Sequence, residues 1–369
     1  MNGIRGNVIV GQSGGPTAVI NSSLAGVFKT AKDRGANKVY GMLHGIQGLL
    51  QERYVDLEDH IKNDLDIELL KRTPSAYLGS CRFKLPDISQ DREIYDKIFD
   101  ILNKLEIEYF FYIGGNDSMD TIKKLSDYSL LNGSNIRFMG VPKTIDNDIY
   151  GTDMTFGFQS AVNIATNAID CIHTTASSHG RVFIVEVMGH KVGSLTLHAG
   201  VAGGADIILI PEIPYDIKKV TAAIQKRAKA GKRFTILAVA EGAISKEDAQ
   251  LPKKKYKEKL EARAKKYPSV SYEIADQIYK ELGNEVRVTV PGHTQRGGEP
   301  CPYDRVLSTR IGAGAAQAII DGEYGVMIGV VNGKIKRVPL EECAGKLKMV
   351  SPKDQLVLAA KQIGISFGD

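Results

Sequence analysis

Short apolar runs alternate with segments of helical periodicity along nearly the whole chain. NVIVG at 7–11 and YFFYI at 109–113 are typical of buried strands. DREIYDKIFDILNKL at 91–105 carries apolar residues three and four positions apart, which is typical of an amphipathic helix. Repeated units of strand and helix predict parallel sheets with helices on both faces.

The expected elements extend from the first residues to the last. Strands are expected at 7–11, 38–43, 109–115, 137–141, 182–189, 205–212, 233–242, 285–292 and 326–333. Helical segments are expected at 14–34, 91–105, 118–131, 158–176, 191–202, 216–231, 246–283, 303–321 and 352–362. The length of 369 residues suits two such sheets. We therefore expect an α/β fold of two Rossmann-like three-layer lobes with mainly parallel sheets.

Composition narrows the class of protein. Hydrophobic residues make up 43% and charged residues 25%, which is ordinary for a soluble globular protein. The longest apolar runs fall well short of the ~20 residues that a membrane helix needs, and the amino-terminal residues read as a strand instead of a signal peptide. The four cysteines (Cys81, Cys171, Cys301 and Cys343) show no CxxC spacing. We expect reduced thiols, no structural zinc and a cytoplasmic protein without membrane contacts.

The net charge of +5 has a local source at residues 253–266. This segment, KKKYKEKLEARAKK, holds eight basic and two acidic residues. A solvated amphipathic helix is the ordinary interpretation of such a segment. The alternative is a nucleic-acid patch, but neither a set of stacking aromatic residues nor a DNA-binding motif accompanies it. We therefore expect no nucleic-acid partner.

Two glycine-rich turns follow expected strands and open helices. They are GQSGG at 11–15 and GGNDS at 114–118. Free backbone amides at a helix start bind anions, so Gly14, Gly15, Gly115 and Ser118 are candidate phosphate ligands. Both GxGxxG and GxxxxGK[ST] are absent here, so phosphate binding would need another scaffold. The competing interpretation of Asp117 and Ser118 is helix capping.

A third turn, PKTIDND at 142–148, concentrates charge after another expected strand. Lys143 is a mobile cation suited to phosphate. Asp146 and Asp148 lie two positions apart, so in an extended segment both would point to the same side. One carboxylate could accept a proton from a sugar hydroxyl and the other could bind Mg²⁺, whereas a single aspartate here would more simply make an Asx turn. Because ligands bind at the carboxyl ends of strands in α/β sheets, the set predicts phosphoryl transfer.

Taken together, these segments resemble the phosphofructokinase family from about residue 7 to 332. The matching motifs are SGGP at 13–16 with Asn21, LGSCRF at 78–83, GGNDS, PKTIDND, HGRVFIVEVMGH at 179–190, AEG at 240–242, RVTVPGHTQRGG at 287–298 and PYDR at 302–305. The resemblance implies phosphoryl transfer to the 1-hydroxyl of fructose 6-phosphate. It also implies a donor-binding lobe at 1–157 plus about 292–340, and a lobe binding fructose 6-phosphate at about 158–291 plus 341–369.

The resemblance assigns roles by motif position. Asp146 would be the catalytic base, assisted by Thr144 and Asp148, and Arg82 would contact the transferred phosphate or the leaving group. The residues that would contact the sugar are Met188, Gly189 and Glu241. Those that would hold its 6-phosphate are Arg181, Arg287, His293 and Arg296, because arginine and histidine make charge-assisted bonds to a dianion. In the family, the arginines matching Arg181 and Arg287 come from a neighbouring subunit, so a homo-oligomer, either dimer or tetramer, is implied.

Asp117 and Lys143 bear on the phosphoryl donor. ATP-using members of the family have glycine at both positions, and the replacements seen here are typical of pyrophosphate-using members. An aspartate would occupy the space of the nucleotide's α-phosphate and repel it, while Lys143 would bind pyrophosphate. We therefore expect a diphosphate–fructose-6-phosphate 1-phosphotransferase that needs Mg²⁺. An ATP-dependent 6-phosphofructokinase is the alternative.

Other features leave further alternatives open. Asn116 stands where most members have a magnesium-binding aspartate, so Asn116 and Asp148 are the candidate metal ligands. That departure also motivates a remote alternative, a non-catalytic subunit that binds sugar phosphates. Ala25 and Lys29 replace effector-binding arginines of allosteric members, which predicts weak nucleotide control. Sedoheptulose 7-phosphate as an acceptor is neither favoured nor excluded.

Overall fold

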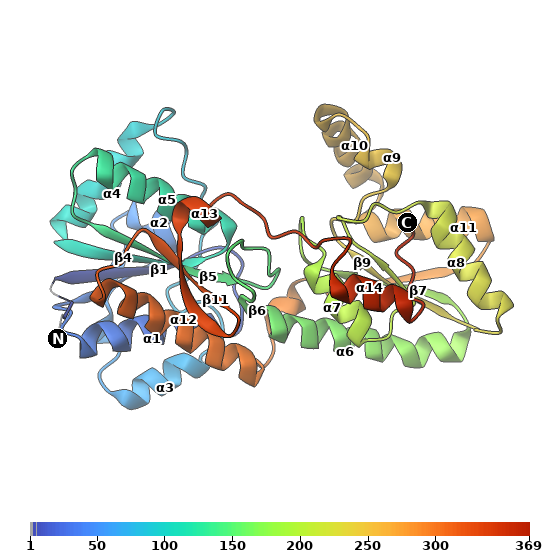
Figure 1. The fold of residues 1–369 in the computed structure, drawn as a ribbon, viewed down its shortest axis with the longest axis horizontal. Helices are drawn as coiled ribbons and strands as arrows, with labels where there is room; N and C mark the ends of the chain where they lie inside the picture. Colours follow the sequence, from blue (N-terminus) through green and yellow to red (C-terminus); the bar gives the residue numbers. More distant parts are fainter. Residues whose placement is uncertain (1–2, 5) are drawn as a thin grey trace. The chain divides into compact units, whose positions relative to one another are not determined.

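The computed structural model describes residues 3–4 and 6–369, which form two compact units (Figure 1). The first unit comprises Met1–Gln159 and Arg296–Lys348, and the second comprises Ser160–Gln295 and Met349–Asp369. The segment 341–348 belongs to the first unit, whereas the sequence placed it in the second lobe. The reason is that α13 (Leu340–Cys343) packs on α5 (Asn116–Leu131), and Leu347 forms an antiparallel bridge with Ile149.

The first unit is built on an eight-stranded sheet with the order β12-β11-β5-β4-β1-β2-β3, in which β6 also pairs with β5. Its strands are β1 (Asn7–Gln12), β2 (Val39–Met42), β3 (Tyr54–Asp56), β4 (Ile107–Gly114), β5 (Arg137–Thr144), β6 (Phe156–Gly157), β11 (Val326–Val331) and β12 (Lys334–Pro339). β3 and β12 at the two edges are antiparallel to their neighbours, and the other pairings are parallel.

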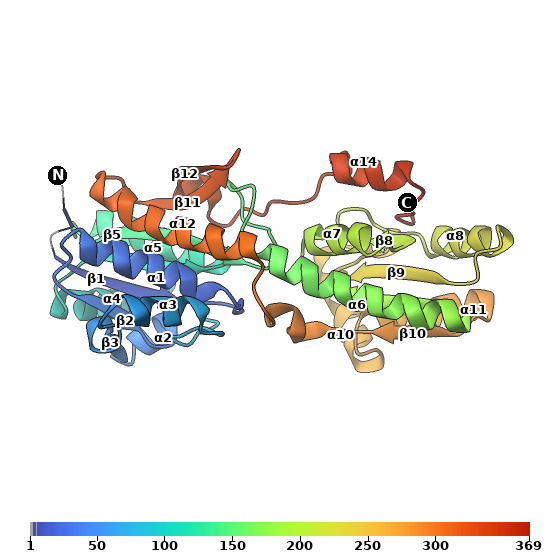
Figure 2. The ribbon, with the colours of Figure 1, turned by 90° about the horizontal axis from the view of Figure 1, so that it is seen from below.

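Helices cover both faces of this sheet, as Figure 2 shows. They are α1 (Ile20–Asp33), α2 (Gly45–Leu49), α3 (Asp64–Arg72), α4 (Arg92–Lys104), α5, α12 (Pro302–Ile320) and α13, with a short 3₁₀ turn η1 (Leu57–Asp59). The alternation along β1 explains the layers. Val8 and Val10 belong to one hydrophobic core with α1 and α12, whereas Ile9 belongs to another with α4 and α5. Because successive strand residues face opposite ways, an all-apolar strand is buried on both sides.

Two glycines let α1 and α12 approach each other closely. A side chain at Gly26 would lie 2.8 Å from the backbone nitrogen of Ala313, and one at Gly312 would lie 2.2 Å from the carbonyl oxygen of Ser23. No real side chain tolerates such distances, so both positions require glycine. The close contact with α12 thus fixes the position of α1, the helix that follows the first glycine-rich turn.

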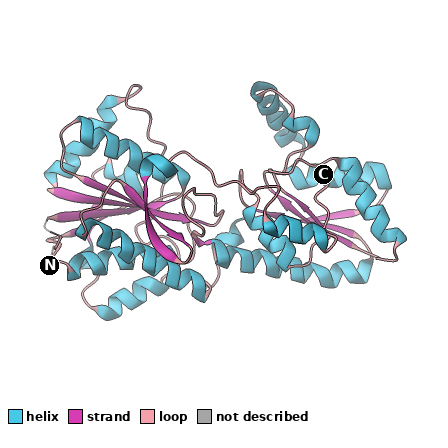
Figure 3. Ribbon diagram, in the orientation of Figure 1, coloured by secondary structure: helices cyan, strands magenta, loops and turns pink. Residues whose placement is uncertain are grey.

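The second unit has a four-stranded parallel sheet with the order β10-β7-β9-β8 (Figure 3). Its strands are β7 (Val182–Val187), β8 (Ile207–Leu209), β9 (Thr235–Ala240) and β10 (Val286–Thr289). Leu237 and Val239 face the core formed with α8 (Ile217–Lys229) and α11 (Val270–Leu282). Ala238 faces Gly200 of α7 (Ser194–Ala202) on the other side. The remaining elements are α6 (Phe158–His179), which begins in the first unit, and α9 (Lys246–Ala249), α10 (Lys253–Lys266), η2 (Gly292–Arg296) and α14 (Gln355–Gln362).

The basic segment forms α10, which has no buried residue. Buried Asp248 in α9 anchors it by accepting ion pairs from Lys259 and Arg263, and Arg263 also pairs with Glu273 of α11. The single helical segment expected at 246–283 is therefore three helices. An exposed helix tied down by ion pairs agrees with the interpretation of this segment as solvated.

The α/β fold with two lobes and mainly parallel sheets is confirmed. The sequence missed α2, β3 and α3 between residues 43 and 90, and it missed the edge strand β12. These elements are short or mostly exposed, so their apolar patterns are weak. Within the described residues, no helix has the length and apolar character needed to cross a membrane.

Candidate active site

The carboxyl ends of β1, β4 and β5 meet at one edge of the first sheet. β4 pairs with β1 on one side and β5 on the other, and Gly114 lies opposite Pro142. The two glycine-rich segments begin in the last residues of β1 and β4, and PKTIDND begins in the last three residues of β5, so that Lys143 itself belongs to the strand. The structure therefore brings together the three segments that the sequence singled out.

The first glycine-rich turn is held by the segment that contains Arg82. The backbone N–H of Gly14 donates to the carbonyl of Cys81 at 3.0 Å, and the Ser80 hydroxyl donates to the carbonyl of Gly14 at 2.5 Å. Cys81 and Ser80 immediately precede Arg82, whose side chain is exposed. These two hydrogen bonds hold the backbone next to Arg82 beside the first glycine-rich turn.

Lys143 lies at the centre of the charged groups. Its side chain is 2% exposed, and its Nζ donates to the carbonyl of Gly15 at 2.6 Å. Burial lowers the pKa of Lys143 to about 8, while the nearby carboxylates of Asp146 and Asp148 act in the opposite direction and Arg296 and Arg82 reinforce the lowering. The guanidinium of Arg296 lies against Gly15, since a side chain there would meet its Cζ at 2.7 Å.

The turn that carries Asp146 and Asp148 is not extended. Asn147 between them has a φ of 52°, in the left-handed region that asparagine tolerates better than most residues. The expectation that both carboxylates point the same way because the segment is extended is therefore wrong. The backbone N–H of Asp146 donates to the Thr144 hydroxyl at 3.1 Å, so Thr144 orients the start of the turn.

The Asn147 amide is enclosed by hydrogen bonds. Its Oδ1 accepts from Lys348 Nζ at 2.9 Å and from the Thr155 backbone N–H at 3.1 Å, and its Nδ2 donates to the carbonyl of Asp153 at 3.3 Å. Thr155 also donates through its hydroxyl to the carbonyl of Thr144. The turn is thus closed on itself by buried polar contacts.

Asn116 and Asp148 lie together at the same edge. Asn116 Nδ2 donates to the carbonyl of Asp148 at 3.3 Å, and Asn116 Oδ1 is buried with no hydrogen-bond partner in the described part of the chain. Burial raises the pKa of Asp148. An orphaned amide oxygen beside a desolvated carboxylate fits the oxygen ligands that Mg²⁺ prefers. Residues 3–4 and 6–369 contain no cluster of three His, Cys, Asp or Glu that could hold a metal alone.

Helix α5 begins two residues earlier than expected and has Gly115 at its N-cap. No side chain caps it, which leaves amides at its start available for an anion. Since the N-cap is Gly115 and no side chain makes a capping bond, the capping interpretation of Asp117 and Ser118 is wrong; Asp117 is exposed in the first turn. Ser118 is buried and its hydroxyl lies over Gly114, where a Cβ would be only 2.0 Å from it.

The second unit gathers other predicted residues at the carboxyl ends of its strands. Met188 and Gly189 follow β7 and Glu241 follows β9. Glu241 Oε1 accepts the backbone N–H of His190 at 2.7 Å, and Gln295 Oε1 of η2 accepts that of Met188 at 3.2 Å. His293 is exposed in the same η2 turn.

Arg181 and Arg287 lie at the opposite end of the same strands. Arg181 immediately precedes β7, and Arg287 pairs in register with Phe183 near the start of β7. Both arginines form ion pairs with Glu285. The six residues of β7 separate Arg181 from Met188, a length of roughly 20 Å, and Arg287 lies level with Phe183, roughly 17 Å from Met188. One chain therefore does not bring these arginines to the sugar-contact residues.

Sequence reasoning missed several residues that hold these groups. Ser80 lies inside a matched motif, which was its only signal, and Gln295 lies inside another. Lys348 and Glu285 lie in segments without a motif, and nothing in the sequence pointed to them.

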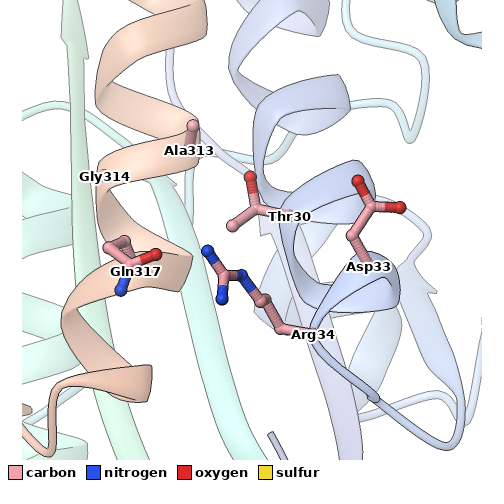
Figure 4. Close-up of a pocket in the computed structure, with 6 residues that line it drawn as sticks. All are labelled: Thr30, Asp33, Arg34, Ala313, Gly314 and Gln317. Carbon is pink, nitrogen blue, oxygen red and sulfur yellow. The ribbon is translucent and has the colours of Figure 1, made fainter. Parts of the chain in front are cut away.

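Two surface pockets of the first unit contain none of the predicted site residues. One of about 420 Å³ lies between α1 and α12 and is lined by Thr30, Asp33, Arg34, Ala313, Gly314 and Gln317 (Figure 4). The other, of about 520 Å³, is lined by α1, α3 and α12. The chemistry expected at the strand ends therefore lies apart from both pockets.

Comparison with known proteins identifies the family and corrects the donor. A family described as Phosphofructokinase matches residues 7–319. An ATP-dependent 6-phosphofructokinase of Spirochaeta thermophila is 41% identical over 97% of this chain and 96% of its own. ATP-dependent 6-phosphofructokinase 3 of Bacteroides thetaiotaomicron is 41% identical over 96% of this chain and 98% of its own. The crystal structure of the pyrophosphate-dependent phosphofructokinase of Nitrosospira multiformis superimposes with a TM-score of 0.82 at 27% identity, covering 98% of this chain and 92% of the other.

The expectation of pyrophosphate as donor, and with it a diphosphate–fructose-6-phosphate 1-phosphotransferase, is wrong. The relatives with 40–41% identity over nearly the full length are ATP-dependent, whereas the pyrophosphate-dependent protein matches at only 27%. The site offers a physical reason. Asp117 is exposed, so its carboxylate does not fill an enclosed volume. The family model, the relatives and the fold agree that the chain belongs to the phosphofructokinase family.

Proposed function

We propose that this protein transfers the γ-phosphoryl group of ATP to the 1-hydroxyl of fructose 6-phosphate. The observation that carries the proposal is the identity of 41% over 97% of the chain with an ATP-dependent 6-phosphofructokinase. The meeting of the two glycine-rich turns with the Asp146 turn at one sheet edge supports it. Such an arrangement suits a reaction that depends on positioning and charge neutralisation.

Asp146 acts as the general base in this proposal. Its carboxylate accepts the proton of the 1-hydroxyl while that oxygen bonds to the γ-phosphorus and the bond from phosphorus to the β,γ-bridging oxygen breaks. ADP then leaves with the bonding electron pair. The contact between the Asp146 N–H and Thr144 Oγ1 holds the base in place, and positioning of this kind lowers a barrier.

Cations and backbone amides would stabilise the phosphates. Lys143, Arg82 and Arg296 are the cations that interact electrostatically around the turn. Gly14, Gly15, Gly115 and Ser118 offer close backbone approach and the uncapped start of α5. Asp117, which is exposed at that start, borders the donor phosphates. Preorganised donors of this kind stabilise developing charge.

Asn116 and Asp148 would hold Mg²⁺ through the orphaned Oδ1 and the buried carboxylate. When bound, the ion would neutralise charge on the phosphate oxygens. The donor's own phosphates would supply further ligands, because Mg²⁺ is usually bound by one or two protein groups plus substrate phosphates.

The second unit would bind fructose 6-phosphate at the ends of β7 and β9. Met188, Gly189 and Glu241 would contact the sugar, with His293 directed to the 6-phosphate. Arg296, which the resemblance assigned to the same phosphate, belongs to the first unit and lies against Gly15 of the donor turn. Arg181 and Arg287 lie roughly 17–20 Å from that edge. We therefore propose a homo-oligomer in which these two arginines complete the site of a neighbouring copy.

The proposal is tested with purified protein, ATP, Mg²⁺ and fructose 6-phosphate, with formation of fructose 1,6-bisphosphate followed by a coupled assay. The wild type should turn over, and D146N should lose at least about 100-fold in kcat, the low end of what a general base contributes. D127N changes a half-exposed aspartate of α5 that pairs only with Lys123 of the same helix in the described part of the chain, and it serves as the control with unchanged kcat. Equal kcat for D146N and wild type would refute the assigned base.

A further inference from the structure

Lys348 is the last residue of the first unit, and no motif marks it. We propose that Lys348 is a positioning residue that fixes the turn carrying Asp146 and Asp148 in its reactive shape. The inference rests on the proposed function, since that function makes Asp146 the base. Two sets of contacts and the backbone conformation of Asn147 carry it.

The side chain of Lys348 donates three hydrogen bonds, one to the turn and two to the segment that follows it. Its Nζ lies 2.9 Å from Asn147 Oδ1, 2.8 Å from the carbonyl of Thr152 and 2.9 Å from the carbonyl of Asp153. An ammonium group has three protons, so these acceptors satisfy all of them. One cation thus links the middle of the turn to the chain that leaves it.

The backbone of Lys348 holds the other side of the turn. Its N–H donates to the carbonyl of Asp148 at 2.8 Å, next to the antiparallel bridge between Leu347 and Ile149. The same carbonyl accepts Asn116 Nδ2. Lys348 therefore contacts Asn147 through its side chain and Asp148 through its main chain.

The left-handed backbone at Asn147 explains why the turn needs such support. A non-glycine residue in this region is strained, and it persists where its surroundings determine it. The Asn147 side chain is 5% exposed, and two of its partners, Thr155 and Asp153, belong to the turn's own continuation. Lys348 is the partner from a distant part of the chain, 201 residues away. Loss of the Lys348 side chain would therefore allow Asn147, the residue between the two aspartates, to leave its left-handed conformation.

Lys32 provides a matched control. Its Nζ also donates to two backbone carbonyls, those of Ala36 and Asn37, and to one side-chain oxygen, that of Glu58. These contacts lie at the end of α1, away from the PKTIDND turn. K32M therefore removes an equivalent set of bonds without touching the predicted base.

The experiment compares K348M, K348R and K32M with wild type in steady-state kinetics and in amide hydrogen exchange. We expect K348M to lower kcat by 10- to 100-fold, because misplacement by about 1 Å can cost 10²-fold, with KM for ATP and fructose 6-phosphate changed less than threefold. Exchange should rise in the peptide spanning 145–155. K348R, which keeps the charge and its donors, should recover part of kcat, and K32M should stay within twofold of wild type.

The inference is overturned by a kcat of K348M within twofold of wild type, by equal kcat of K348R and K348M, or by unchanged exchange at 145–155. A wild-type enzyme that fails to phosphorylate fructose 6-phosphate refutes the proposed function instead. The exchange measurement still decides whether Lys348 fixes the turn, because it needs no turnover.

Discussion

Removing the ammonium group of Lys143 should change how activity depends on pH. Lys143 is 2% exposed and its pKa lies at about 8 because of burial. Charge is lost as pH rises through that value, so the charged fraction is about 90% at pH 7 and about 10% at pH 9. If the proposed phosphate contact needs the charge, kcat/KM for ATP should fall about tenfold between these pH values.

K143M removes both the charge and the bond to Gly15. The proposed hydrogen bond from the Lys143 ammonium to an ATP phosphate would contribute about 1.5–3 kcal/mol, as bonds to charged groups do. Its removal corresponds to a loss of roughly 10- to 150-fold in kcat/KM for ATP at pH 7. The variant should also lose the part of the alkaline limb near pH 8 that Lys143 causes, while Lys348, whose pKa burial likewise lowers to about 8, keeps its own contribution. The assay is kcat/KM for ATP at saturating fructose 6-phosphate from pH 6.5 to 9.5. An unchanged alkaline limb in K143M would refute the reasoning.

The lowered pKa of Lys143 also predicts how the stability of the protein depends on pH. The pKa of Lys143 in the folded protein lies below its usual value of 10.5, so burying the charged form opposes folding. The folded state releases this proton first as pH rises, and its stability should therefore increase between about pH 8 and 10.5. The full shift corresponds to about 3 kcal/mol. The free energy of unfolding of the wild type relative to K143M, measured with urea at pH 7 and pH 10, should rise with pH, and a difference independent of pH would contradict the shift.

Three further predictions follow from burial, ion pairing and the proposed assembly. Burial raises the pKa of the Cys343 thiol to about 11, whereas Cys171 is exposed, so a disulfide reagent at pH 8 should label Cys171 at least tenfold faster in native protein; equal rates would show that Cys343 is accessible. R263M should destabilise the protein by about 1.5–3 kcal/mol, because Asp248 and Glu273 each lose a bond to a charged group while Lys259 still pairs with Asp248. K257M on the exposed helix α10 should change the free energy of unfolding by less than about 0.5 kcal/mol, and similar values for both would contradict the anchoring role. Mixing refolded D146N and R287M subunits should restore activity, because a hybrid contains one intact site if Arg287 acts in the neighbouring copy, and mixtures as inactive as their parents would place Arg287 in its own chain's site.

Much of the fold followed from apolar pattern, because buried strands leave strong signals. Val8, Ile9 and Val10 are all buried, because helices cover both faces of the sheet. Polar residues therefore do not interrupt the apolar run that predicts the strand. The short helices and the edge strand between residues 43 and 90 were missed because α2 and β3 are only five and three residues long. In α3 the leucines Leu65 and Leu69 are exposed, so its apolar residues do not form one buried face.

The site was predicted residue by residue but not in its geometry. The motifs named Lys143, Asp146 and Asp148, and the structure places them on one sheet edge. The left-handed backbone of Asn147 and the support from Lys348 depend on contacts between distant segments, which no local pattern reveals. The donor was misjudged because Asp117 was expected to fill space, whereas its side chain is exposed.

The most direct test of the account compares donors in one assay. The purified protein is incubated with fructose 6-phosphate and Mg²⁺, with ATP in one series and pyrophosphate in the other, and kcat/KM is measured for each donor. The account predicts that ATP supports turnover and that kcat/KM for pyrophosphate is at least about 100-fold lower. Turnover with pyrophosphate that equals or exceeds that with ATP would contradict it.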